Sequence, residues 1–167
     1  MQTKHEPVVD QLRAAFPPTA IDSKDAFLSW GMTYLDGDEY AKQLNGKRWD
    51  EIDRAYLARR SDALGFLGTS HLVAILPAYL REMIEADPFS TVPGMLTLTL
   101  TKPGPKIDSG LGKKRFNELV EALSDSQRAA VAAALQTYAA ERAETGSGSA
   151  AQLALDMYWH QFLDRKD

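Results

Sequence analysis

Residues 65–84 read GFLGTSHLVAILPAYLREMI and predict the central helix of this chain. Their apolar side chains recur at the i, i+3, i+4, i+7, i+8 and i+11 spacing, which gathers them on one helical face and which a strand does not produce. These side chains are Leu72, Ile75, Leu76, Tyr79, Leu80 and Met83. We expect Thr69 to cap the helix at its start. We expect Asp87 and Pro88 to end it near Ala86.

Pro77 lies in the middle of this predicted helix. A proline there removes one backbone hydrogen bond and clashes with the preceding turn, at a cost of roughly 3 kcal/mol. We therefore expect a kink, or a break into two helices. His71 lies in the first turn, where we expect it to be solvated or to cap the helix. The other histidines, His5 and His160, share no metal-ligand spacing with it.

The remaining pattern is also mainly helical. We expect a mainly α fold, a single-domain bundle of about six to seven helices over residues 1–167. Besides residues 69–86, the expected helices are 6–15, 21–34, 36–44, 50–60, 113–123, 124–143 and 150–163. Ser124 and Gln127 have the spacing of a capping box at the start of the alanine-rich helix. Flexible loops are expected at 102–112 and 145–149, which are rich in glycine with proline or serine.

One segment, 95–101, has two possible readings. Its sequence MLTLTLT alternates leucine with threonine, which is a strand signature. We find no second good strand for it to pair with. Either it pairs across a dimer, or the core overrides the local preference and makes it helical.

Composition excludes several classes of protein. The chain has 167 residues, 44% hydrophobic and 25% charged, with a net charge of -4. A nucleic-acid binder would need a basic stripe to displace counterions from phosphates, and the mild negative charge argues against one. We therefore expect no nucleic-acid partner. The absence of cysteine excludes disulfides and thiolate chemistry. No apolar run is long enough to span a membrane, and the first residues show no secretory signal, so we expect a cytoplasmic protein without a membrane partner.

Familiar catalytic and cofactor motifs fail when they are read residue by residue. The Gly112-Lys113 pair is followed by Lys114, not by the serine or threonine of a phosphate loop. A calcium loop starting at Asp36 would need glycine at the sixth position, which is Ala41. Neither a Gly-x-Ser-x-Gly elbow nor a Glu-x-x-His pair is present. We therefore expect no enzyme activity, no cofactor and no metal.

An acidic segment with interleaved aromatic residues, 36–53, is the candidate protein-binding site. Aromatic side chains anchor protein interfaces, and charges steer the encounter with a partner. The alternative is a solvated helical face with Trp49 packed inward as core. The candidate residues are Asp36, Asp38, Glu39, Tyr40, Trp49, Asp50, Glu51 and Asp53. The loop from Lys102 to Lys114 is a second candidate for contacts with the partner.

The chain resembles a family of bacterial proteins catalogued as a domain of unknown function. The resemblance covers most of residues 45–160 and is most specific at Leu76-Pro77-Ala78-Tyr79-Leu80. It also rests on Trp49, Leu64-Gly65-Phe66-Leu67, Arg115-Phe116, Leu123-Ser124-Asp125-Ser126-Gln127 and Tyr158-Trp159. It implies that Pro77 is a built-in kink of the family's central helix, and it favours helix for 95–101. It implies no activity.

Small acidic bacterial domains without cysteine or a catalytic cluster often serve as immunity proteins. We expect an antitoxin-like immunity protein, a toxin inhibitor that binds and occludes an effector of a contact-dependent or type VI secretion system. Its partner would be a cognate toxin encoded by a neighbouring gene. This expectation is associational, because fold class alone does not specify function. The alternatives are a helical-bundle enzyme with a carboxylate or metal site, and a self-associating structural or regulatory subunit.

Overall fold

The structure is a computed structural model that describes residues 4–24, 26–27, 36–105 and 111–163. These residues form eight α-helices, and the expected mainly α fold is confirmed. The helices are α1 (Glu6–Ala15), α2 (Gly37–Leu44), α3 (Arg54–Arg59), α4 (Thr69–Glu85), α5 (Val92–Leu100), α6 (Leu111–Ala122), α7 (Asp125–Glu141) and α8 (Gly146–Met157). Short 3-10 helices lie at η1 (Trp49–Glu51), η2 (Ser61–Gly65) and η3 (Trp159–Phe162).

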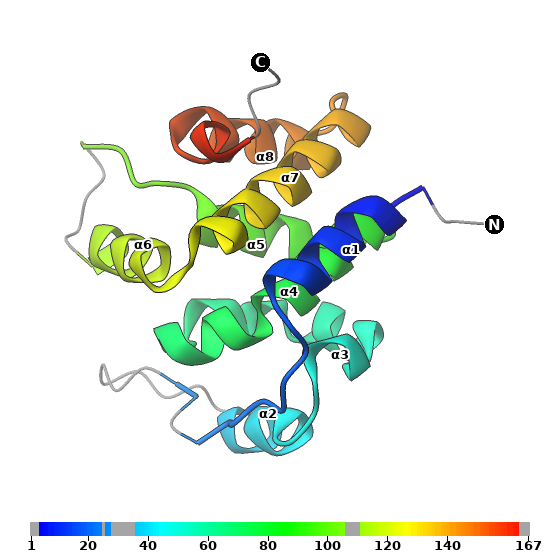
Figure 1. Cartoon of the computed structure of the whole chain (residues 1–167), viewed down its shortest axis with the longest axis vertical. Coiled ribbons are helices and arrows are strands. Elements are labelled where there is room, and N and C mark those ends of the chain that lie inside the picture. The colour runs from blue at the N-terminus through cyan, green and yellow to red at the C-terminus, as the bar shows by residue number, and fades with distance from the viewer. Residues whose placement is uncertain (1–3, 25, 28–35, 106–110, 164–167) are drawn as a thin grey trace.

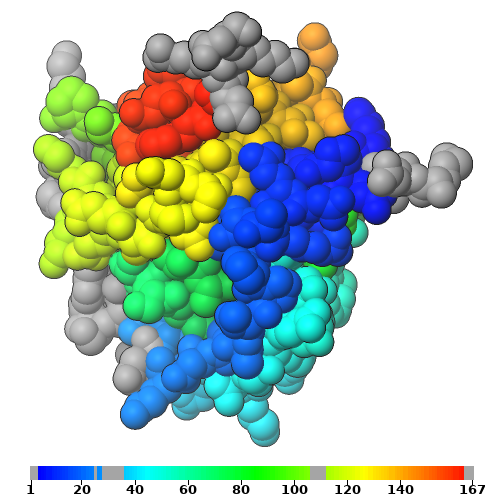
Figure 2. Space-filling view, viewed as in Figure 1, coloured from blue at the N-terminus to red at the C-terminus, as the bar shows by residue number. Residues whose placement is uncertain are grey.

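Helix α4 is the centre of the bundle, as its apolar periodicity predicts. It contacts α1, α3, α5, α6, α7 and η1, and in Figure 1 it lies between α2 and α3 below and α7 and α8 above. On the face shown in Figure 2 the blue surface of α1 meets the yellow surface of α7. The buried apolar side chains form one hydrophobic cluster to which all eight helices contribute, together with connecting residues such as Phe16, Ile52 and Leu123.

The start and the middle of α4 differ in detail from the sequence prediction. Gly68, not Thr69, is the N-cap residue, and its carbonyl accepts from Leu72 N at 2.9 Å. Thr69 is the first helical residue. The helix is continuous through Pro77, so the alternative of a break into two helices is wrong. Pro77 is buried, and the tertiary contacts of α4 offset the hydrogen bond that it removes.

His71 is in the core, so the expectation of a solvated or capping histidine is wrong. Only 5% of it is exposed, and neither ring nitrogen makes a hydrogen bond of ordinary geometry, although the backbone of Asp22 interacts with the ring. Its ring meets that of Tyr40 edge to face, with 6.1 Å between the centroids. Burial lowers the pKa of His71, and Asp22 opposes this shift only in part.

Residues 95–101 are helical up to Leu100, within α5, which decides between the two readings of the alternating segment. Pro93 lies in the first turn, where a proline is well tolerated. The threonine hydroxyls donate to backbone carbonyls four residues earlier: Thr97 to Pro93, Thr99 to Met95 and Thr101 to Thr97, at 2.7, 2.9 and 2.7 Å. These bonds satisfy the hydroxyls inside a helix, and burial of Leu96 and Leu100 overrides the strand preference.

The predicted helix at 21–34 is wrong over its described part. Residues 21–24 and 26–27 are not helical. Ile21 N donates to the carbonyl of Lys47, and Phe27 forms an isolated bridge with Leu67. Backbone pairing with distant segments therefore replaces the local helix. Residues 28–34 of that prediction lie outside the described residues.

The predicted helix at 50–60 is divided into η1 and α3, because Asp53 caps a new helix: its side chain accepts from Ala55 N. The flexible break predicted at 145–149 is also wrong. Gly146 begins α8, and the side chain of Thr145 caps it by accepting from Gly148 N at 3.1 Å. Capping by Thr145 gives this glycine-rich stretch a helical start that composition alone does not indicate.

Several predicted boundaries are confirmed. Helix α1 has the expected bounds, Glu6–Ala15. The capping box is present, with Ser124 Oγ accepting from Gln127 N at 3.2 Å and Gln127 accepting from Ser124 N at 2.9 Å.

Among the described residues, no helix is both long enough and apolar enough to cross a membrane.

Candidate functional site

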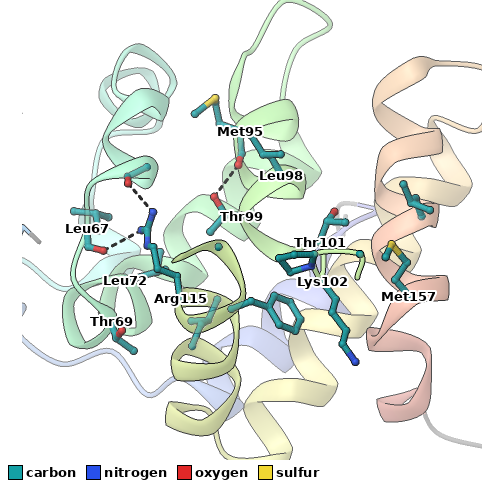
Figure 3. A pocket seen from close by; sticks show the side chains of 17 residues that line it. Leu67, Thr69, Leu72, Met95, Leu98, Thr99, Thr101, Lys102, Arg115 and Met157 are labelled. Atoms are coloured by element: carbon teal, nitrogen blue, oxygen red, sulfur yellow. Dashed lines mark hydrogen bonds between the residues drawn. The ribbon is translucent and has the colours of Figure 1, made fainter. Parts of the chain in front are cut away.

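An apolar groove opens between the start of α4, α5, α6 and α8, with a cavity of about 510 Å³. This volume lies in the range of ordinary ligand and anchor pockets. Figure 3 shows the groove from close by. Its lining is Gly65, Leu67, Thr69, Leu72, Met95, Leu98, Thr99, Thr101, Lys102, Pro103, Gly104, Gly112, Arg115, Phe116, Leu119, Leu153 and Met157. Most of these side chains are aliphatic or aromatic, so the groove favours an apolar occupant.

The helical conformation of α5 accounts for one wall of the groove. In a strand, Leu96, Leu98 and Leu100 would share one face, but in a helix Leu98 turns away from the other two. Leu96 and Leu100 are fully buried, whereas 71% of Leu98 is exposed. The hydroxyl of Thr99 in the same wall already donates to Met95 (Figure 3), which removes a polar donor from the lining.

The apolar surface extends beyond the cavity onto its rim. Leu153 and Met157 of α8 are 52% and 37% exposed, and both line the groove together with Leu98. Large exposed apolar side chains that occur singly are ordinary, but a contiguous set at the edge of a cavity marks an interaction surface. The fourth large exposed apolar residue among those described, Phe89, is 93% exposed and does not line this groove.

Among the described residues of the lining, the charged ones are Lys102 and Arg115, and both are basic. Arg115 donates to the carbonyl oxygens of Gly65, Leu64 and Leu67 at 2.6, 3.3 and 3.2 Å, which fixes α6 against the segment before α4. Burial lowers the pKa of Arg115, and Glu118 opposes the shift. Lys102 lies over the ring of Tyr158, with its Nζ 5.8 Å from the ring centroid.

Aromatic packing holds the α6 and α8 walls together beneath the groove. The ring of Phe116 meets those of Tyr158 and Trp159 edge to face, at centroid distances of 5.1 and 6.2 Å. Tyr158 and Trp159 are in turn 5.3 Å apart. Such pairs are each worth about 0.5–1.5 kcal/mol beyond area burial. The groove is therefore set in a packed wall.

The acidic segment does not present aromatic anchors, which corrects the prediction for Tyr40 and Trp49. Both side chains are core residues, with 0% and 2% exposed. Trp49 donates its indole N–H to the carbonyl of Phe16 at 2.7 Å, and Tyr40 shares a 3.3 Å hydrogen bond with Tyr79. Burying the large apolar ring is more favourable than exposing it to a partner. The structure therefore agrees with the alternative reading, in which Trp49 packs inward as core.

Three of the six predicted acidic residues form ion pairs within the chain. Asp36 pairs with Arg60 at 2.7 Å, and both Asp50 and Glu51 pair with Arg48, at 2.9 and 3.7 Å. The hydrogen bond from Arg48 holds the pKa of Asp50 below its ordinary value. Local pairing reduces the charge that this segment offers to a partner.

Two of the acidic residues do meet in one place. The structure brings Glu39 and Asp53 together in a polar cleft of about 670 Å³, which they share with Lys47, Arg59 and Arg60. Asp38 is exposed on α2 and is not part of this cleft. The mixed charge of the cleft favours neither a strongly basic nor a strongly acidic partner.

Sequence reasoning missed the groove, although part of it lies in a segment that the sequence singled out. Lys102, Pro103, Gly104 and Gly112 belong to the expected contact loop, and all four line the groove. The remaining signal was Leu98, because a helical drawing of 95–101 leaves it on a different face from Leu96. Residues 106–110 of the loop lie outside the described residues.

Nowhere in the described part of the chain do three histidine or acidic side chains gather as a metal ion would require.

The fold and the groove define a helical protein with an apolar groove at its surface. The family model of a family of unknown function (DUF6714) matches residues 8–163, and the chain belongs to this family. This matched range is longer than residues 45–160, which the resemblance in the sequence covers. No curated protein and no solved structure matches the chain.

Proposed function

We propose that this protein works by binding a helical segment of a partner protein in the groove between α4, α5, α6 and α8. The observation that carries the proposal is the exposure of Leu98, Leu153 and Met157 at the rim of an apolar cavity. A small molecule in the cavity would leave these rim side chains in water. A helix lying along the groove would cover the rim and place one of its own apolar side chains in the cavity, which is a common mode of peptide recognition.

The lining suits such a ligand in a second respect. Methionine side chains adapt to the shape of an apolar partner at low cost, and Met95 and Met157 stand on different walls of the groove. Phe116 and Leu119 form part of the floor, and both are almost fully buried. A rigid floor with an adaptable rim favours an apolar stripe, with side chains at i, i+3 or i+4, and i+7, over a single anchor.

The test is a binding measurement with a designed helix. The probe is a fluorescein-labelled amphipathic peptide with leucine at i, i+3, i+4 and i+7 and glutamine elsewhere, followed by fluorescence anisotropy. We expect saturable binding to the wild type and a loss of affinity of about tenfold or more in Leu98→Glu, because the charge would be buried at the contact. Phe89→Glu is the matched control, because Phe89 is also a large exposed apolar residue but lies outside the groove, and this variant should bind as the wild type does.

Three results would overturn the proposal. The first is no saturable binding by the wild type. The second is equal loss of affinity in Leu98→Glu and Phe89→Glu, which would indicate nonspecific hydrophobic adsorption. The third is a wild-type dimer in sedimentation that Leu98→Glu dissociates, because the groove would then be the contact between two copies of this chain.

Within this class of binding proteins, we propose the particular role of an antitoxin-like immunity protein in the cytoplasm of the producing cell. The support is compositional: a short acidic chain without cysteine, and without a recognised catalytic motif. The test is co-expression with the product of the neighbouring gene. Growth arrest by that product alone, relieved by the wild type and not by Leu98→Glu, is the expected result. A neighbouring product that is harmless, or that this protein does not bind, would remove the immunity role and leave the groove proposal intact.

A further inference from the structure

Charge on the two sides of the groove distinguishes between classes of partner helix. Among the described residues that line it, Lys102 and Arg115 are the charged ones, and both are basic in a chain whose net charge is -4. In Figure 3 they lie on opposite sides: Arg115 beside Leu67 and Leu72, and Lys102 on the side of Met157. The apolar floor therefore has a positive charge along each flank.

Within the part of the chain that the structure describes, no carboxylate forms an ion pair with either residue, although the charge of Glu118 acts on Arg115. The guanidinium of Arg115 donates to three neutral carbonyl oxygens, and the ammonium group of Lys102 lies over the ring of Tyr158. Glu118, three residues further along α6, interacts with Arg115 through its charge, but its ion pair is with Lys114 at 3.7 Å and its other oxygen accepts from Thr69 at 3.5 Å. Cations that border an apolar groove and lack a carboxylate partner attract acidic groups on the ligand.

We infer that the groove recognises an acidic amphipathic helix in which carboxylates flank the apolar stripe on both sides. This inference rests on the proposed function and specifies its partner. The apolar stripe would occupy the floor, and glutamate or aspartate on its two edges would face Lys102 and Arg115. A helix with the same net charge but with its acids opposite the stripe would place them in water, away from both cations. Position, not net charge alone, is thus what the groove selects.

The experiment compares three labelled peptides with one apolar stripe and equal length. The first has glutamates flanking the stripe, the second has the same composition with the glutamates on the far face, and the third has lysines at the flanking positions. Anisotropy titrations are made at low and at physiological salt. We expect the flanking-glutamate peptide to bind about tenfold more tightly than the far-face peptide at low salt, and the lysine peptide most weakly. The advantage should shrink at higher salt.

Charge reversal at Lys102 supplies the second arm. Lys102→Glu should abolish most of the preference for flanking glutamate and improve binding of the lysine peptide. Lys42→Glu, which reverses an exposed lysine on α2 outside the groove, is the matched control and should keep the preference. Arg115 is not varied, because its guanidinium holds the backbone before α4. Circular dichroism confirms that both variants fold.

The outcomes separate the two proposals. Equal affinity for the flanking and far-face peptides, or an unchanged preference in Lys102→Glu, would overturn the inference about charge and leave helix binding intact. If none of the peptides binds, the proposed function fails as well. Displacement of a bound peptide by a fatty acid, with saturable fatty-acid binding and no preference among the peptides, would identify an anionic amphiphile as the occupant and overturn the inference.

Discussion

The indole nitrogen of Trp159 lies 2.7 Å from the carbonyl oxygen of Leu100, so η3 donates a hydrogen bond to the last residue of α5. Trp49 makes the same kind of bond to the carbonyl of Phe16, at the end of α1. Carbonyls at the C-terminus of a helix have no partner within the helix, and each indole satisfies one of them. The Trp159 bond also joins α5 to the segment that follows α8, and both helices are walls of the groove.

Replacement of Trp159 by phenylalanine is expected to destabilise the protein by about 2–4 kcal/mol, since it leaves a buried carbonyl unpaired and a small cavity. Chemical denaturation measures the change. Tyr158→Phe is the matched control, because it keeps its ring contacts with Phe116 and Trp159 and should change stability by less than about 1 kcal/mol. Equal stability of Trp159→Phe and wild type would show that the bond contributes nothing to holding α5 in place.

The first turn of α8 passes close to the backbone of Arg142 at Gly148. A Cβ at this position would collide with the carbonyl oxygen of Arg142, whereas a Cβ at Gly146 would meet open space. Gly148→Ala should therefore cost about 1–3 kcal/mol, because the backbone on one side must move. Gly146→Ala should be within about 0.5 kcal/mol of the wild type. Thermal melting of the two variants measures the difference, and equal melting temperatures would contradict the close approach.

Local periodicity was enough to find the long helices and not enough to find the short connections. Helix α4 was predictable because its apolar face repeats over about three turns, and Ser124 with Gln127 marked the start of α7. The predicted helix at 21–34 rested on the spacing of Phe27, Trp30 and Tyr34, yet in its described part Ile21 pairs with Lys47 and Phe27 with Leu67. Pairing between segments that are distant in sequence leaves no trace in a single local pattern.

The candidate site was less predictable than the fold, and α5 shows why. The alternation of leucine and threonine favours a strand, and only tertiary burial of Leu96 and Leu100 makes the segment helical. Leu98 is exposed because the segment is helical. The groove therefore depends on tertiary burial overriding the strand preference of the alternating sequence. Trp49 shows the opposite error: an aromatic residue among acids looks like an anchor, but its ring is worth more in the core.

A half-buried ion pair joins α3 to α4. Arg54 Nε lies 2.7 Å from Glu82 Oε2, and the Glu82 side chain is 6% exposed. Arg54→Met would leave this carboxylate buried without its partner, and we expect a loss of about 3 kcal/mol. Arg13→Met removes an exposed pair with Asp10 and should cost less than about 1 kcal/mol. Urea denaturation at pH 7 compares the two, and losses of equal size would mean that Glu82 reaches water when Arg54 is removed.

The buried His71 makes stability depend on pH in a defined direction. Its folded pKa lies below the ordinary value of about 6.5, so both the folded and the unfolded states hold it neutral above that pH. As the pH falls below 6.5, the unfolded chain takes up a proton on His71 that the folded chain does not take up until its lower pKa is reached. The unfolded state then binds more protons, and the free energy of unfolding decreases on acidification.

The variant that isolates this effect is His71→Leu, because leucine fills the site without a polar atom. Neither ring nitrogen of His71 makes a hydrogen bond of ordinary geometry, so the variant should lose little stability relative to the wild type at pH 7.5, no more than its interaction with the Asp22 backbone contributes. Between pH 7.5 and 5.5 it should lose less stability than the wild type in urea denaturation. If His71→Leu and the wild type lose the same free energy over this range, protonation of His71 is not what destabilises the fold in acid.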